Sequence, residues 1–505
     1  MLHPIAADPR CCKGWDQPPR FAMSVSVFLY LARGVSGTEK GDDPAAGRRK
    51  LAGGKGRAPV WPGLRAVAWT LLAGLGGLTM TSCRSTGGSG DGTGTPPNVD
   101  LTVKPWFPPV VRQQGNSCAQ QAGLYYLLTA EWNRQRGLSS RHSPASRLSP
   151  YQSYAMLADN QAAGTHVEDG WQLAGSMGVP LESEVPRGGS ALMHGFDKYV
   201  RAASRKPDRW QYWPMRAAGD LPAVRKLLAS GHPLACDFQI RGAKLVKLPD
   251  GRGTLVKEWG TTGPGHTMVY AGYDELVGWD FNGDGKITND IDINGDGRVT
   301  LADWERGAFL MVNPWGPGWA TGGKAWVPWR THAQAGWPRA WEVASVTAAS
   351  SDKPPRLMLK LLIQLRDRGS LIITAGTGGR EATRPDRTVQ PPPFRAIPLP
   401  LTHSGTPGAW EVFARTRRSG PFLASGPLAA PGGGPVELGL DVSDLEKNEG
   451  RFFLELSAAG GGALDGTLIK ASVVTLDRSG RVKEEIPFTD LPARVPRSGG
   501  RWVSP

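Results

Sequence analysis

Three residues whose types could together carry out nucleophilic catalysis occur in the chain order Cys118, His266, Asn313. A cysteine can attack a carbonyl carbon, a histidine can move the proton, and an amide can orient the histidine ring. Cys118 directly precedes a helix-like run, Ala119 to Arg136. The unpaired N–H groups and partial positive charge of a helix start favour thiolate over thiol. The pattern therefore predicts a thiol hydrolase with Cys118 as its nucleophile.

Other cysteines and histidines fit this chemistry less well. Cys236 lies in an apolar, strand-like run, where we expect a small buried side chain. His166 falls in a loop and His232 in a turn. His266 itself lies in a mostly apolar run, so its assignment depends on the residues that accompany it.

The segments around these residues resemble the papain-like cysteine peptidases, from about residue 98 to residue 348. That family has a Gln-Gly-x-Cys-Gly-Ser-Cys-Trp segment, a Gly-His-Ala strand and an Asn-Ser-Trp-Gly loop. The corresponding landmarks follow one another in the family's order, at residues 113–121, 148–151, 178–182, 224–233, 265–266 and 307–323. The resemblance implies an α+β fold, a papain-like two-lobed domain with a helical lobe and an antiparallel β lobe.

The sequence also departs from the family pattern. Ala119 stands where the family has Trp, and Pro314 stands where it has Ser. The second cysteine of the nucleophile loop is missing, and the loop before the nucleophile is shorter. The shorter loop leaves two candidates for the oxyanion-hole glutamine, Gln113 and Gln114. Gln113 is preferred, because it lies closer to the family's separation from the cysteine.

The resemblance implies a role for each residue. Cys118 would attack as a thiolate, and His266 would pair with it as an imidazolium and then protonate the leaving amine. Asn313 would accept a hydrogen bond from the other ring nitrogen, and Trp315 would cover that bond. The Gln113 amide and the Cys118 backbone N–H would hold the oxyanion. Such chemistry uses no metal or other cofactor.

Between His266 and Asn313 lies an insert, residues 279–305, with two copies of the pattern Asp-x-Asn-x-Asp-Gly. This pattern is typical of calcium loops with oxygen ligands at positions 1, 3, 5 and 7 and a carboxylate at position 12. We therefore predict a structural Ca²⁺ site. The expected ligands are Asp280, Asn282, Asp284, Asp290, Asp292, Asn294, Asp296 and Asp303, with the carbonyls of Lys286 and Arg298.

The two loops differ in completeness. The second has Asp303 at position 12, whereas the first has Ile291 there, which leaves Asp290 or Asp292 to serve. The loops begin 12 residues apart, too close for a helix between them. The insert therefore resembles thrombospondin type 3 repeats more than paired EF-hands or a dockerin. The alternative is a cluster of polar turns, in which so many carboxylates would repel one another.

The front of the chain has the layout of a secretory signal. A basic region, 1–65, precedes an apolar run, 66–78, and the small residues before Cys83. This order resembles the lipobox of bacterial lipoproteins, so we expect residues 1–82 to be a leader and Cys83 to carry lipid. The alternative is a chance apolar stretch. The late position of the signal suggests a translation start downstream of Met1.

The predicted mature chain would begin with a flexible, Gly/Ser-rich tether, residues 83–97. We expect a lipoprotein on the bacterial cell envelope, or a secreted protein, without disulfides. The formal net charge is +14, to which the leader contributes a surplus of Lys and Arg. No dense basic block with interleaved aromatic residues remains, so nucleic acid is not an expected partner.

The last third of the chain changes character. Residues 350–355 are predicted to form a linker, and residues 356–492 have short alternating runs separated by Gly/Pro-rich turns. This pattern predicts a C-terminal all-β sandwich-like domain with an accessory, targeting or interaction role.

Three functional hypotheses follow. The first is an exported cysteine peptidase acting on protein or peptide substrates and anchored to a membrane through Cys83. The second is a surface binding protein on the same scaffold whose catalysis has decayed. The third is an acyl transferase or amidase that uses the same Cys-His pair. The presence of Cys118, His266 and Asn313 together disfavours the second.

Overall fold

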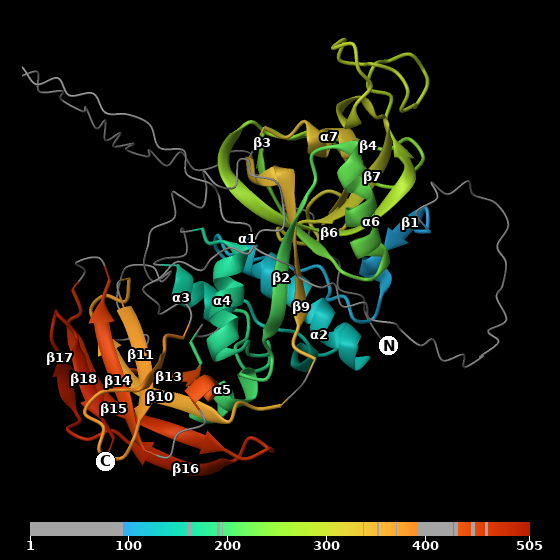
Figure 1. The fold of residues 1–505 in the computed structure, drawn as a ribbon. Coiled ribbons are helices and arrows are strands. Elements are labelled where there is room, and N and C mark those ends of the chain that lie inside the picture. Colours follow the sequence, from blue (N-terminus) through green and yellow to red (C-terminus); the bar gives the residue numbers. More distant parts are fainter. Residues whose placement is uncertain are drawn as a thin grey trace, which may run out of the picture. The chain divides into compact units, whose positions relative to one another are not determined.

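The computed structural model describes residues 94–158, 164–188, 192–193, 195–336, 338–350, 353–369, 371–391, 428, 433–445, 450–459 and 463–504. Cys83 and the predicted leader lie outside these residues. Residues 84–505 form one compact unit, which mixes α-helices and β-strands (Figure 1). None of the helices among the described residues is long and apolar enough to cross a membrane.

The helix that follows the nucleophile loop is continuous over three segments. They are α1 (Cys118–Gln120), a π-helical stretch (Gln121–Leu128) and α2 (Thr129–Arg136). The predicted helix from Ala119 to Arg136 is thus confirmed. It ends at Gly137, whose φ of 62° lets its N–H bond the carbonyls of Arg134 and Asn133.

Five further α-helices are found among the described residues. α4 is buried along almost its whole length, and its Trp171 is fully buried and donates to the Gly123 carbonyl of the nucleophile helix (3.1 Å). The bounds are α3 (Tyr151–Leu157), α4 (Val167–Met177), α5 (Phe196–Ala202), α6 (Leu221–Ala229) and α7 (Trp329–Ala333).

A mostly antiparallel sheet carries the other two site candidates. Its order is β2-β9-β3-β6-β7-β8-β5-β4, and β1 also pairs with β6. β6 is the longest of these strands, and its central residues are apolar and buried. The bounds are β1 (Asn98–Asp100), β2 (Pro207–Pro214), β3 (Leu234–Arg241), β4 (Lys244–Lys247), β5 (Thr254–Glu258), β6 (Thr262–Gly278), β7 (Arg306–Val312), β8 (Lys324–Pro328) and β9 (Glu342–Ala348).

The last third of the chain forms two antiparallel sheets. One has the order β13-β10-β15-β16, with β17 also on β15, and the other has the order β12-β11-β14-β18 (Figure 1). The bounds are β10 (Leu357–Leu365), β11 (Leu371–Gly378), β12 (Arg387–Val389), β13 (Val436–Asp441), β14 (Arg451–Ala458), β15 (Gly466–Leu476), β16 (Val482–Pro487), β17 (Ala493–Val495) and β18 (Gly500–Val503).

Two details of the predicted domain layout need correction. The predicted end at residue 492 is too early, because β18 pairs with β14 in the register Leu454↔Trp502. The sheets are also not separate from the preceding domain. Their core cluster includes Tyr151 of α3, Leu173 of α4 and Tyr199 of α5. The predicted linker therefore joins parts that share one buried core.

Candidate active site

Cys118 is the first residue of α1 and is buried, with 9% of its surface exposed. The loop before it turns back, and the Gln121 N–H bonds the Ser117 carbonyl at 2.8 Å as the helix begins. The thiol lies 3.9 Å from the Asn116 carbonyl oxygen. The predicted position of the nucleophile candidate at a helix start is confirmed.

His266 lies on β6 opposite Phe238 of β3, and Asn313 directly follows β7. The pairing of β6 with β7 in the register Val269↔Val312 places these two residues at the same end of the two strands. The Nε2 atom of His266 lies 2.8 Å from Oδ1 of Asn313. Two residues 47 positions apart in the sequence are therefore joined in a buried hydrogen bond.

The surroundings of Asn313 define the donor in this bond. Its Oδ1 also accepts the backbone N–H of Trp315 at 3.0 Å, so Oδ1 is the acceptor and His266 Nε2 donates. The other ring nitrogen, Nδ1, is then the one left to exchange a proton. The Trp315 ring lies over the imidazole, with 4.8 Å between ring centroids. This agrees with the predicted covering role of Trp315.

Two contacts bring the nucleophile loop to these strands. α1, which begins at Cys118, contacts β6, and Thr267, the residue after His266 on β6, lowers the pKa of Cys118 through hydrogen bonding. The Gln113 N–H donates to the carbonyl of Pro314 at 2.7 Å, which ties the loop before Cys118 to the loop that carries Asn313. The start of α1 therefore lies next to the strand that carries His266, and the loop before it contacts the loop that carries Asn313.

Burial affects both proton-exchanging groups. It raises the pKa of the Cys118 thiol, although hydrogen bonds from Thr267 and Ala119 act in the opposite direction. Burial also lowers the pKa of His266, against the Asn313 bond, which raises it. Removal from water thus favours the neutral pair, and only a nearby opposite charge or dipole can restore the thiolate and imidazolium.

Asp237 is an ionisable residue near the site that the sequence analysis missed. It lies on β3 directly opposite Thr267. Its negative charge raises the pKa of Cys118 and also that of His266. No short motif marks Asp237, and only its strand register opposite Thr267 brings it near the site.

The predicted oxyanion glutamine is not decided by the geometry. The Gln113 side-chain amide donates to the carbonyl of Gly115 at 2.8 Å, within its own loop. The side-chain nitrogen of Gln114 lies near Gly188. The preference for Gln113 stays a prediction.

The rival residues have other surroundings. Cys236 is buried, and burial raises its pKa well above the usual value, so it is a poor nucleophile. His232 pairs with Glu131 at 2.7 Å on the nucleophile helix. The carbonyl of His166 accepts from the Gln120 amide just before α4. His332, which the sequence analysis did not single out, is fully buried with a pKa lowered to about 4 by burial.

The predicted calcium insert occupies the connection between β6 and β7, beside α7 (Figure 1). Glycines at positions 4 and 6 of both loops have φ near +80°, as the tight turns require: Gly283, Gly285, Gly295 and Gly297. Asp280 accepts from the Gly283 and Gly285 N–H groups, and Asp292 accepts from those of Gly295 and Gly297.

The donor atoms of the insert are all oxygens, which is the chemistry that calcium prefers. Among the described residues, however, no three His, Cys, Asp or Glu side chains converge closely enough to hold a metal ion. The carboxylates bond the backbone N–H groups of their own loops instead. The residues of the insert thus have the oxygen donors that a calcium ion would need, and calcium binding stays a prediction.

A residue not expected from the sequence takes the twelfth-position role in the first loop. In the second loop, Asp303 accepts the N–H groups of positions 2, 3 and 9, namely Ile293, Asn294 and Thr300. In the first loop, Glu305 accepts those of Phe281, Asn282 and Thr288, the same three positions. The first loop is thus closed by Glu305, which the sequence analysis did not name, whereas Asp290 or Asp292 stays the ligand predicted there.

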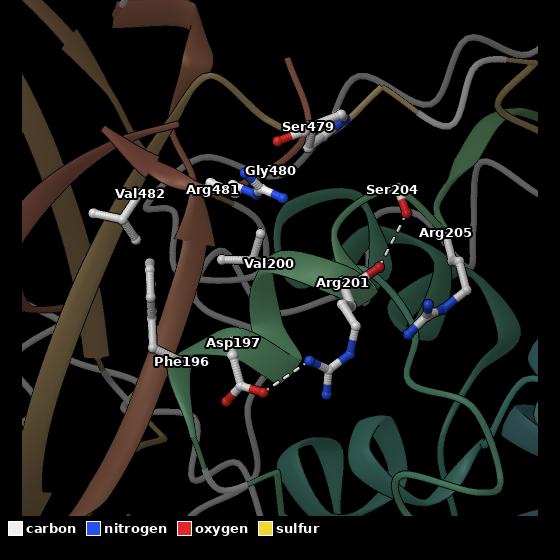
Figure 2. A pocket seen from close by; sticks show the side chains of 11 residues that line it. Phe196, Asp197, Val200, Arg201, Ser204, Arg205, Ser479, Gly480, Arg481 and Val482 are labelled. Atoms are coloured by element: carbon white, nitrogen blue, oxygen red, sulfur yellow. Dashed lines mark hydrogen bonds and ion pairs between the residues drawn. The ribbon is translucent and has the colours of Figure 1, made fainter. Parts of the chain in front are cut away.

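A hollow of about 550 Å³ lies elsewhere, between α5 and the turn that joins β15 to β16 (Figure 2). Arg201 and Arg205 line it, but both already pair with Glu184, and Arg201 also pairs with Asp197. Neither a cysteine nor a histidine is among its described lining residues. It offers neither the nucleophile nor the base for the predicted chemistry.

No protein-family model and no curated protein matches the chain. Solved structures of cysteine proteases are similar to it. Xylellain from Xylella fastidiosa is 17% identical over 50% of this chain and 87% of its own, with a TM-score of 0.33. Recombinant stem bromelain precursor is 14% identical over 50% and 71%, with a TM-score of 0.35. The ragweed pollen protease Amb a 11 in its proform is 17% identical over 51% and 66%, with a TM-score of 0.33. At these TM-scores the likeness adds nothing to the geometry of the site.

The charge of Asp237 leads to a testable pH dependence. A negative charge stabilises the imidazolium and destabilises the thiolate, so it raises both pKa values. Asp237→Asn removes the charge and keeps the shape. We expect both limbs of the pH profile of Cys118 alkylation by iodoacetamide to move to lower pH. Glu258→Gln, a change at an exposed carboxylate, is the control. A shift to higher pH would contradict the placement of Asp237.

Proposed function

We propose that the chain is an exported, papain-like cysteine endopeptidase, which hydrolyses peptide bonds in protein or peptide substrates. The observation that carries this proposal is the buried bond between His266 Nε2 and Asn313 Oδ1, together with a Cys118 thiol at the start of a helix that contacts the strand of His266. That bond leaves Nδ1 of His266 as the atom that exchanges a proton.

The first half of the reaction forms an acyl-enzyme. The Cys118 thiolate attacks the peptide carbonyl carbon, and the carbonyl oxygen becomes an oxyanion. The Cys118 backbone N–H at the helix start, with Gln113 or Gln114, would hold this oxyanion. The C–N bond breaks as the His266 imidazolium gives its Nδ1 proton to the leaving amine. A thioester and a neutral imidazole remain.

The second half returns the free enzyme. The neutral His266 imidazole takes a proton from water, whose oxygen attacks the thioester carbon. Collapse of this second tetrahedral intermediate releases the carboxylate product and the Cys118 thiolate. Asn313 holds the ring in one orientation through both halves, which is why its own burial matters.

The two alternatives differ from this proposal in measurable ways. A binding protein with decayed catalysis would keep the fold but would not need a reactive thiolate. An acyl transferase or amidase would keep the thiolate but transfer the acyl group to an acceptor other than water. Labelling of Cys118 by a thiolate-specific epoxide inhibitor distinguishes a peptidase from a binding protein with decayed catalysis. Hydrolysis of a peptide library distinguishes a peptidase from an acyl transferase or amidase.

The site residues are tested by substitution. Cys118→Ala should abolish both peptide hydrolysis and epoxide labelling. His266→Ala should lower kcat by about 10²-fold or more, because it removes the general acid and base. Asn313→Ala should cost less and should leave thiolate labelling intact, because it misaligns the ring without removing it. The measurements are kcat, KM and the labelling rate for each variant.

Cys236→Ala is the matched control, since Cys236 is the other cysteine among the described residues. It should leave hydrolysis and labelling near the wild-type values. Loss of labelling in this variant alone would reverse the assignment of the nucleophile. Negligible losses for both His266→Ala and Asn313→Ala would mean that the active site lies elsewhere.

Calcium binding by the insert stays a prediction. What supports it is the repeated Asp-x-Asn-x-Asp-Gly pattern together with the equivalent positions of Asp303 and Glu305. We propose one structural ion in each loop, with Glu305 as the twelfth-position ligand of the first. The insert connects the strand that carries His266 to the strand that leads to Asn313, so its order affects how these two residues are held.

Isothermal titration with Ca²⁺ tests this proposal by stoichiometry. The wild type should bind two ions, and Glu305→Gln and Asp303→Asn should each lose one. A bound ion stabilises the folded state by about 2.7 kcal/mol when its free concentration is 100 times the Kd, so chelator should lower Tm. Glu258→Gln serves as the control. Identical melting curves with calcium and with chelator would show that the insert is only a polar loop.

Export and lipidation at Cys83 also stay predictions, since the leader lies outside the described residues. Cys83→Ser should release the protein from the membrane fraction and block incorporation of labelled palmitate. A mature protein that still carries residues 1–82 would contradict processing before Cys83.

A further inference from the structure

The C-terminal sheets pack directly on the helices next to the candidate active site. Tyr151 and Met156 of α3 belong to the same buried cluster as Leu361 of β10 and Leu454 of β14. The hydroxyl of Tyr199 on α5 donates to the carbonyl of Glu437 on β13 at 2.7 Å. These contacts are those of a shared core, which a separate accessory module would not need.

One side chain from the C-terminal domain forms hydrogen bonds with the end of α3. Arg368 lies between β10 and β11 and is only 7% exposed. Its Nε donates to the Met156 carbonyl at 3.2 Å, and one terminal nitrogen donates to the carbonyls of Ala155 and Ala158 at 3.1 and 2.8 Å. The last carbonyls of a helix have no partner within the helix, so a cation here caps the helix and complements its dipole.

The same helix holds the nucleophile loop. The hydroxyl of Tyr154, the residue before Ala155, accepts the backbone N–H of Asn116 at 3.1 Å. The carbonyl of Asn116 is in turn the oxygen that the Cys118 thiol contacts. Tyr154 is 2% exposed, so neither the ring nor its hydroxyl can move without a rearrangement of the core. A short path of contacts therefore runs from Arg368 through α3 to the residue that positions the thiol.

We propose that Arg368 is a positioning residue for Cys118, so that the C-terminal β domain is a working part of the active site. The cap fixes the last turn of α3, this turn fixes Tyr154, and Tyr154 fixes the peptide unit of Asn116 beside the nucleophile. The catalytic meaning of this proposal rests on the proposed function. The coupling of Arg368 to the reactivity of the Cys118 thiol is measurable without a peptide substrate.

The experiment is a double-mutant cycle in the full chain. Arg368→Met removes the donors and keeps much of the apolar stem, and Tyr154→Phe removes one hydroxyl. Each variant and the double variant are measured for kcat, KM and the rate of Cys118 alkylation at several pH values, well below the Tm of each. Arg494→Met is the matched control, because Arg494 is on the same domain with a side chain that is 81% exposed.

We expect Tyr154→Phe to lower both kcat and the alkylation rate by about threefold to tenfold, the usual effect of losing one hydrogen bond. Arg368→Met should lower them at least as much, with KM within about twofold of the wild type. The double variant should lose no more than the single variant with the larger loss, because both changes break the same path. Arg368→Lys, which keeps the cation, should recover part of the loss, and Arg494→Met should show none.

Losses that multiply in the double variant would overturn the proposal, and so would an Arg368→Met variant that behaves like Arg494→Met. If Arg368→Met does not fold, the cycle is run with Arg368→Lys, and non-additivity with Tyr154→Phe is again the required result. A wild type that labels at Cys118 but hydrolyses no peptide contradicts the proposed function. The alkylation rates then still support or overturn the coupling.

Discussion

The hydrogen bond between His266 and Asn313 is the interaction on which the candidate site depends. It forms because β6 and β7 pair in a register that places Asn313 just beyond Val312, close to the level of His266. A slip of one residue would turn His266 to the other face of the sheet. The core residues of β6 and β7 are almost completely buried, so such a slip would expose them. The hydrophobic pattern of two strands thus sets the orientation of one imidazole ring.

Burial that fixes the site also works against its chemistry. Both the thiol and the imidazole are shifted toward their neutral forms when water is excluded. The helix start at Cys118 and the carboxylate of Asp237 act on this balance in opposite ways for the thiol. The helix start favours the thiolate, whereas Asp237 favours the imidazolium and disfavours the thiolate. A thiolate–imidazolium pair would therefore require Cys118 and His266 to approach each other closely, and hence both side chains to be fixed in position.

Two parts of the chain that are remote in sequence contribute to the positioning of Cys118 and His266. The insert joins β6 to β7 and is closed by Asp303 and Glu305. Besides the local contact of Asp303 with Thr300, these carboxylates accept backbone N–H groups that lie 9 to 24 residues away along the chain. The C-terminal sheets reach the other side of the site through Arg368 and α3. Both parts act on backbone groups, so neither needs to touch a substrate to affect the geometry around Cys118.

The sequence by itself determined the local features. The helix after Cys118, the apolar strand around His266 and the strands of the last third follow from side-chain periodicity and from glycines that end elements, as Gly137 does. The resemblance to papain-like peptidases added the expected roles of Cys118, His266 and Asn313. The tertiary structure alone decided which distant residues meet. Arg368 bonds a carbonyl 212 residues away, Glu305 closes the first loop of the insert, and Asp237 reaches the site only through strand register. Periodicity reports the face on which a residue lies, whereas a contact between distant segments depends on how whole elements pack, which no local pattern encodes.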